Sequence, residues 1–251
     1  MITRFHVPIF LAVGGVAATA IAAVAPAAEA PAPRPVVTMT ARVSPSKLPI
    51  APGTPLTLRL HTAFRSVPAG GNFVLQRAVY LFGRGARFNG ALFPSCSVAK
   101  LRRAHGRLSA CPKGSRIGYG VATGRAVAVG ISSQGRLTAF NGPGGRSVVF
   151  NVAVVTPALI NATFEAPVVR LHGGKYEFKL STAVPPELQQ VLDGDVVVER
   201  LDVTSGATLT IGGRRRGYFE AASCPRRGSA IRGEFHFNQG ASATTELKVV
   251  C

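Results

Sequence analysis

Short runs in which apolar and polar residues alternate, separated by Gly and Pro, dominate this chain. From Leu56 to His61, leucine alternates with Thr, Arg and His, and Lys175–Leu180 alternates three charged residues with Tyr, Phe and Leu. A period of two is typical of a β-strand that buries one face. The 28 Gly and 18 Pro supply turns between such strands. We therefore expect an all-β fold, a sandwich or two stacked antiparallel sheets with one or two short helices.

Two segments have helical patterns. Ser97–His105 is expected to form a short helix beside a cysteine. A second helix of about two turns is expected to open at Pro185-Pro186-Glu187 and end at Asp193-Gly194. The stretch Cys111–Gly124 is rich in turn residues. Its glycines at positions 118, 120 and 124 do not match the dinucleotide-binding fingerprint, so we interpret them as turn glycines.

The N-terminus has the pattern of an exported protein. Residues 1–27 combine a basic start, an apolar run and small residues at the end, which is typical of a signal peptide cleaved after Ala27. Cleavage after Ala30, or an uncleaved membrane anchor, are the alternatives. Residues 28–35 then form a Pro/Ala linker, and residues 36–251 form the all-β part, as one domain or as two packed β subdomains.

Four cysteines follow the signal peptide, which is an even number in an oxidising compartment. Two disulfides are the expected result, and we favour the local pairing of Cys96 with Cys111 and of Cys224 with Cys251. Closing each short loop would add about 3–4 kcal/mol of stability. The spacing contains no C-x-x-C, and no His sits at ligand spacing from a Cys, so we do not expect a metal site. We expect no cofactor either.

Charge is distributed very unevenly along the chain. Residues 30–164 carry seventeen Lys and Arg and no Asp or Glu, whereas residues 165–251 carry eleven bases and ten acids. The acid-free part cannot itself supply a catalytic carboxylate pair, a calcium site or an acid that orients a histidine. Any carboxylate-dependent chemistry must therefore draw on the last 87 residues.

A net charge of +18 would attract anionic polymers such as teichoic acid, acidic polysaccharide or lipid headgroups. The candidate anion-binding residues are Arg102, Arg103, Arg214, Arg215 and Arg216. Nucleic acid is not the expected partner, because the Phe and Tyr residues occupy strand positions that should face the core. The alternative interpretation is compositional: 23 of the 29 bases are Arg, as a GC-rich coding bias would give.

Catalytic motifs are incomplete. Ser97-Val98-Ala99-Lys100 matches the S-x-x-K of penicillin-binding enzymes, but the partner motifs S-D-N and K-T-G are missing. A hydrolase would have to work through Asp193, Asp195 or His236, and Asp193-Gly194-Asp195 also fits a simple turn.

Several segments together resemble an uncharacterised family of secreted all-β proteins from high-GC Gram-positive bacteria. The segments that carry the resemblance are Ser44–Pro49, Phe93–Cys96, Cys111-Pro112 with Ile117–Gly120, Ala139–Gly142, and Cys224-Pro225 with the terminal cysteine. The resemblance implies export, a β-rich fold and two cysteine pairs. It implies no activity, ligand or catalytic residue.

We therefore predict a secreted, disulfide-stapled protein without enzymatic activity. It would act as an extracellular or wall-associated binding or structural module, with an anionic cell-envelope polymer as the candidate partner. The alternative function is an envelope-associated hydrolase that uses the C-terminal carboxylates. No integral membrane segment is expected after signal cleavage, and the oligomeric state stays open.

Overall fold

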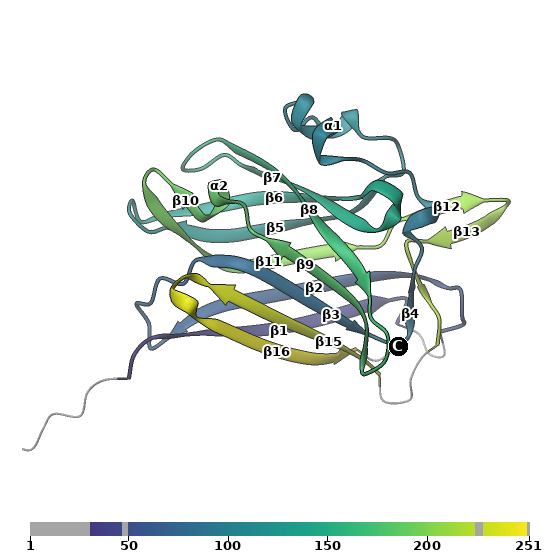
Figure 1. Cartoon of the computed structure of the whole chain (residues 1–251), viewed down its shortest axis with the longest axis horizontal. Helices are drawn as coiled ribbons and strands as arrows, with labels where there is room; N and C mark the ends of the chain where they lie inside the picture. Colours follow the sequence, from purple (N-terminus) through teal and green to yellow (C-terminus); the bar gives the residue numbers. More distant parts are fainter. Residues whose placement is uncertain (1–30, 47–49, 224–227, 250–251) are drawn as a thin grey trace, which may run out of the picture. The chain divides into compact units, whose positions relative to one another are not determined.

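Antiparallel ladders connect most of the strands, which confirms the predicted all-β class (Figure 1). The computed structural model describes residues 31–46, 50–223 and 228–249. The strands are β1 (Arg34–Ser44), β2 (Pro55–Val67), β3 (Leu75–Gly83), β4 (Ala86–Phe88), β5 (Arg116–Ala126), β6 (Ile131–Asn141), β7 (Ser147–Val154), β8 (Ile160–Arg170), β9 (Tyr176–Ala183), β10 (Gln190–Val191), β11 (Gly194–Ser205), β12 (Thr208–Ile211), β13 (Arg214–Gly217), β14 (Phe219–Ala221), β15 (Ser229–Phe237) and β16 (Ser242–Val249). The helices are α1 (Val98–Arg103) and α2 (Pro186–Gln189), with 3₁₀ turns η1 (Gly90–Leu92), η2 (Leu108–Ala110), η3 (Pro143–Gly145) and η4 (Asn238–Gly240).

The strands form two antiparallel sheets that share β8. The first sheet has the order β1-β2-β11-β5-β6-β7-β8, and the second continues as β8-β9-β3-β15-β16. β8 pairs with β7 as far as Pro167 and with β9 from Val168 onward. Proline has no N–H for a ladder, so Pro167 suits the point where the strand leaves one sheet for the other.

The core lies between the two sheets and is built from the inward half of each alternating strand. Val37, Leu60 and Phe64 of the first sheet pack against Tyr80 and Phe235 of the second. A second cluster gathers apolar residues of β5, β6 and β7 around the buried ring of Tyr218. At the other edge β1 lies beside β16, so the two sheets also approach each other there (Figure 1). The space between the sheets is therefore bounded at one edge by the shared strand β8 and at the other by β1 and β16.

The glycines of β5 correct one sequence-based interpretation. Gly118, Gly120 and Gly124 lie inside the strand, opposite β11, and not in turns. A Cβ at Gly118 would lie 2.8 Å from the carbonyl oxygen of Thr204, and one at Gly120 would collide with that of Asp202. Glycine is needed here because the β5 and β11 backbones approach closely.

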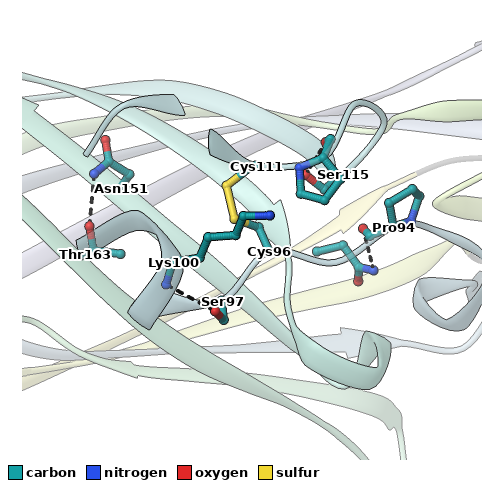
Figure 2. The surroundings of a disulfide bond; sticks show 10 residues. Pro94, Cys96, Ser97, Lys100, Cys111, Ser115, Asn151 and Thr163 are labelled. Atoms are coloured by element: carbon teal, nitrogen blue, oxygen red, sulfur yellow. Dashed lines mark hydrogen bonds between the residues drawn. A yellow bond between two sulfur atoms is a disulfide. The ribbon is translucent and has the colours of Figure 1, made fainter. Parts of the chain in front are cut away.

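A disulfide-bonded excursion between β4 and β5 covers the part of the outer face of the first sheet that β6, β7 and β8 form. Cys96 and Cys111 are bonded, with Cα atoms 5.3 Å apart (Figure 2). They pack with Leu101, Phe140 and Val149. This confirms the first predicted pair. Cys224 and Cys251, the second predicted pair, lie outside the described residues, as does the predicted signal peptide.

Asn141 attaches this excursion to the sheet. Its buried side-chain amide donates to the carbonyls of Gly90, Phe93 and Pro94 at 3.0, 2.9 and 3.2 Å. The Ala139–Gly142 segment thus holds the chain that leads into Cys96, and the disulfide then closes the loop.

The second helix is shorter than predicted. α2 ends at Gln189, and Leu192 and Asp193 follow with φ of 50° and 58°. Two consecutive left-handed residues between paired strands match a type I′ turn. The chain therefore reverses from β10 into β11 instead of continuing as a helix.

Glu220 is a buried acid with a complete set of partners. Its carboxylate is 1% exposed and accepts from Arg216 Nε and Nη2 at 2.9 and 3.1 Å and from the Gly217 amide at 3.0 Å. Burial opposes ionisation, but the guanidinium and the amide outweigh it and hold the pKa of Glu220 below its ordinary value.

We predict that Glu220→Gln lowers the free energy of unfolding at pH 7 by about 2 kcal/mol, because a charge-assisted buried network is lost. A lowered folded-state pKa gives stability that is present above the unfolded pKa and disappears as the pH falls through the folded pKa. Urea unfolding between pH 7 and about pH 3 should therefore show a weaker acid dependence for the variant. Glu199→Gln, at a half-exposed ion pair with Arg125, is the control and should change little. Equal losses for the two variants would contradict this account of Glu220.

Candidate functional site

A row of side chains crosses the outer face of the first sheet. In the ladders Arg42 lies directly opposite Arg59, Arg59 opposite Thr204, and Thr204 opposite Tyr119. Their sequence neighbours Leu58, Leu60 and Val203 face the interior, so the alternation of the strands directs this row outward. Adjacent strands are about 4.8 Å apart, so the row spans roughly 14 Å from β1 to β5.

The row lines a surface groove of about 420 Å³. Short side chains of Thr40, Val121 and Thr204 contribute to its lining, beside the longer side chains of Arg42, Arg59 and Tyr119. We refer to this feature as the Arg42–Arg59 groove. It combines two guanidinium groups with an aromatic ring on one face of the sheet.

Tyr119 is unusually exposed for an aromatic residue in this protein. Its exposed fraction is 53%, and the Arg116 guanidinium carbon lies 5.6 Å from the ring centroid. A cation over an aromatic face is attracted by the ring quadrupole, which helps to fix the ring. Tyr119 therefore presents a positioned aromatic surface at the end of the groove.

His61 and Asp202 form the adjacent row. His61 Nδ1 lies 2.6 Å from Asp202 Oδ1, and Arg200 Nε lies 3.0 Å from Asp202 Oδ2. An ionised carboxylate can only accept, so the ring nitrogen carries the proton. All three side chains are about half exposed. The negative charge of Asp202 is thus engaged by His61 and Arg200 and not by Arg42 or Arg59.

This pair was not identified from the sequence, in which His236 was the candidate histidine for a hydrolase. Asp202 does come from the acid-containing part, as expected, but its histidine comes from the acid-free part, 141 positions away. The alternation of polar and apolar residues in the sequence could place His61 and Asp202 each on the polar face of its own strand. It could not show that β11 lies beside β2.

Arg42 and Arg59 have no carboxylate partner among the described residues. Of the described Lys and Arg between positions 30 and 164, Arg125 alone has an acid within 4.0 Å, namely Glu199. Like charges directly opposite each other destabilise a ladder. A bound anion between the two guanidinium groups would offset that repulsion.

The predicted anion-binding arginines are not gathered into one patch. Arg102 Nη2 donates to the Thr163 carbonyl at 3.0 Å and so attaches α1 to β8, while Arg216 is paired with Glu220. Within the described part of the chain, Arg103, Arg214 and Arg215 have no acid partner. The hairpin β12–β13, which carries the last two, is a separate two-stranded sheet (Figure 1).

The residues proposed for a hydrolase are also separated. Asp193 and Asp195 lie at the β10–β11 turn and at the start of β11, whereas His236 lies on β15 of the second sheet, opposite Arg77. Across residues 31–46, 50–223 and 228–249, no group of three or more His, Cys, Asp or Glu side chains is placed to hold a metal ion.

The S-x-x-K match coincides with a helix cap. Ser97 Oγ accepts from the Lys100 backbone N–H at 3.3 Å, at the N-terminus of α1 (Figure 2). This is the ordinary role of a serine at this position, since it satisfies one of the free N–H groups of the first turn.

No protein-family model, curated protein or solved structure matches the chain. The resemblance to the secreted all-β family stays a prediction. None of the helices in the described ranges has the length and apolar character needed to cross a bilayer.

Proposed function

We propose that this protein is a secreted, non-enzymatic binding module, and that the Arg42–Arg59 groove holds phosphate- or carboxylate-bearing polymers of the cell envelope. The observation that carries the proposal is the direct opposition of Arg42 and Arg59 on one exposed face, with no described carboxylate within 4.0 Å of either. Asp202 also lines the groove, but its carboxylate is paired with His61 and Arg200. Export rests on the predicted signal peptide.

The chemistry of the groove favours a repeating anion over a small neutral ligand. Guanidinium groups bind phosphate and carboxylate oxygens through paired hydrogen bonds, and two of them side by side can engage one anionic group or two successive ones. The ring of Tyr119 adds an amphipathic surface about three strands away, against which a sugar ring of the polymer can pack. The surrounding positive charge raises the local concentration of a polyanion.

A salt-graded binding panel tests this function. The protein without its predicted signal peptide is passed over immobilised poly(glycerol phosphate), polygalacturonate and neutral dextran. We expect retention on both anionic polymers that falls steeply as the ionic strength rises, and no retention on dextran. Retention that is independent of salt, or absent from both anionic polymers, would contradict the proposal.

A hydrolase of envelope polymers is the second candidate, and the His61–Asp202 pair favours it, because a carboxylate that orients an imidazole is a common part of a general base. The contact of Asp202 with Arg200 and the open position of both side chains favour a supporting role in the groove. Asp202→Asn separates the two functions. Polymer cleavage by the wild type that disappears in this variant, with binding retained, would support the hydrolase.

A further inference from the structure

A cavity of about 230 Å³ lies between the two sheets. It is separate from the Arg42–Arg59 groove, which lies on the outer face of the first sheet. Apolar residues of both sheets form most of its wall, and none of the described Lys, Arg, His, Asp or Glu residues lines it. A charged group would lose its hydration there without gaining a partner, so the interior suits an apolar occupant.

Small residues on two neighbouring strands leave this space. Ala122 of β5 pairs with Gly135 of β6, and Gly124 pairs with Ser133, and all four line the cavity. Across from them, Leu180 of the second sheet also lines it and is only partly buried, as expected for a side chain that borders a void. Protein interiors are otherwise close-packed, so a void of this size calls for an explanation.

Aromatic rings close one end of the cavity. Phe88, Tyr218 and Phe219 line it there, and the Phe88 ring centroid lies 5.0 Å from that of Tyr218 and 4.5 Å from that of Phe219. The backbone N–H of Tyr218 donates to the carbonyl of Ala207, just after the last residue of β11. The closed end therefore lies where β11 ends.

Three chain connections lie at the opposite end, where β11 begins. The β5–β6 turn and the β7–β8 loop share this end because β5 to β8 are consecutive antiparallel strands. The β10–β11 turn joins them, since Val196 lies opposite Ala126 and the Val127 N–H donates to the Asp195 carbonyl at 2.8 Å. The cavity lining extends to this end, because Val154, which lines the cavity, directly precedes the β7–β8 loop.

These connections carry exposed apolar side chains. Leu159 and Val155 of the β7–β8 loop are 85% and 73% exposed, the highest values among the large hydrophobic residues of the described chain. Val129, Ile131 and Leu192, on or beside the other two turns, are exposed as well. Scattered apolar residues on a surface are ordinary, but a group of them beside an apolar cavity marks an interaction site.

We infer that the cavity is a binding site for the alkyl chain of a single-chain lipid, and that the chain enters between these turns from a lipid surface that Val155 and Leu159 contact. A cavity of about 150 Å³ holds benzene, so by proportion one of about 230 Å³ holds roughly nine carbon atoms. The polar headgroup stays outside, because the interior has no charged partner for it. This inference goes beyond the function proposed for the outer groove and does not depend on it.

A series of 1-alkanols tests the cavity. Isothermal titration calorimetry gives the dissociation constants of hexan-1-ol to undecan-1-ol, each below its solubility limit. We expect the dissociation constant to fall about fourfold for each added methylene up to about nine carbons, because each one leaves water for the apolar interior, and to change little beyond. No binding by any member, or an affinity that keeps rising to the longest alcohol, would overturn the inference.

A matched pair of variants locates the bound chain. Val198 lines the cavity and Val197, its neighbour on β11, does not. Val198→Phe fills part of the space and should weaken binding of nonan-1-ol at least tenfold, whereas Val197→Phe should leave it unchanged. Thermal unfolding shows that each variant is folded, and Val196→Phe is a second variant that narrows the open end. Unchanged affinity in folded Val198→Phe and Val196→Phe, or an equal loss in Val197→Phe, would contradict the site.

Vesicle sedimentation tests the entry from a lipid surface. Neutral phosphatidylcholine vesicles in about 0.5 M salt are used, so that the basic charge of the protein contributes little. We expect the wild type to sediment with the vesicles, and Val155→Ser with Leu159→Ser to lower this association several-fold while binding nonan-1-ol as the wild type does. Leu108→Ser with Ile211→Ser, at exposed positions of η2 and β12, is the control and should change little. Absent sedimentation of the wild type, or equal losses in the two double variants, would contradict uptake from a lipid surface.

Discussion

Replacing Arg42 and Arg59 together by glutamine should lower the affinity for anionic polymers about tenfold at low ionic strength. It should also reduce by about two the slope of log affinity against log salt concentration. Glutamine keeps much of the length and polarity of each side chain but removes its charge. The two residues face each other in the β1–β2 ladder, so one polymer segment would lose both contacts at once. Binding to immobilised poly(glycerol phosphate) over a range of salt concentrations measures both quantities.

The matched control is Arg214→Gln with Arg215→Gln. It removes the same formal charge from exposed positions of the β12–β13 hairpin, which were predicted from the sequence as anion-binding candidates. A small loss of affinity in this control, beside the large loss in the groove variant, assigns binding to the groove. Equal losses would show that the overall net charge, and not the groove, attracts the polymer.

Replacing Cys96 and Cys111 by alanine should lower the free energy of unfolding by about 3 kcal/mol. The bond closes a loop with a sequence separation of 15 residues, and a loop of that size contributes about this amount in the chain-entropy model. Both cysteines are buried against Leu101, Phe140 and Val149, so their loss also leaves α1 less tightly attached to the sheet. Urea unfolding of the variant and the wild type measures the difference.

The same variant should retain its affinity for anionic polymers under native conditions. The disulfide-bonded excursion packs on β6–β8, whereas the Arg42–Arg59 groove is formed by β1, β2, β11 and β5. A stability loss below about 1 kcal/mol would contradict the role assigned to the bond. A parallel loss of polymer binding would show that the groove depends on the excursion.

The sequence predicted individual strands well because their signal is local. Leucine at positions 56, 58 and 60 faces the interior as the period of two requires. The Cys96–Cys111 disulfide could also be predicted from the sequence, because cysteines that are close in the chain tend to pair with each other. In β5 the prediction from local sequence was wrong, because Gly118, Gly120 and Gly124 were interpreted as turn residues but lie within the strand. Glycine usually marks turns, but here a close approach between two backbones requires it.

The order of the strands in the sheets could not be predicted from the local sequence. β11 lies between β2 and β5, which are far from it in the sequence, and this placement brings Asp202 to His61 and Tyr119 into the row of Arg59. Local patterns carry no information about such neighbours. The predicted arginines were chosen because they are adjacent in sequence. Arg214, Arg215 and Arg216 lie on strand β13, where successive side chains point to opposite faces. Residues that face each other across strands, such as Arg42 and Arg59, form the groove instead.

Arginine-selective labelling gives the most direct test of the binding groove. The protein is modified with phenylglyoxal in the presence and absence of poly(glycerol phosphate), and the extent of modification at each arginine is read by mass spectrometry. We predict that the polymer protects Arg42 and Arg59 and leaves Arg214 and Arg215 as reactive as in the free protein. Uniform protection of all exposed arginines, or protection of Arg214 and Arg215 in place of the groove residues, would contradict the account.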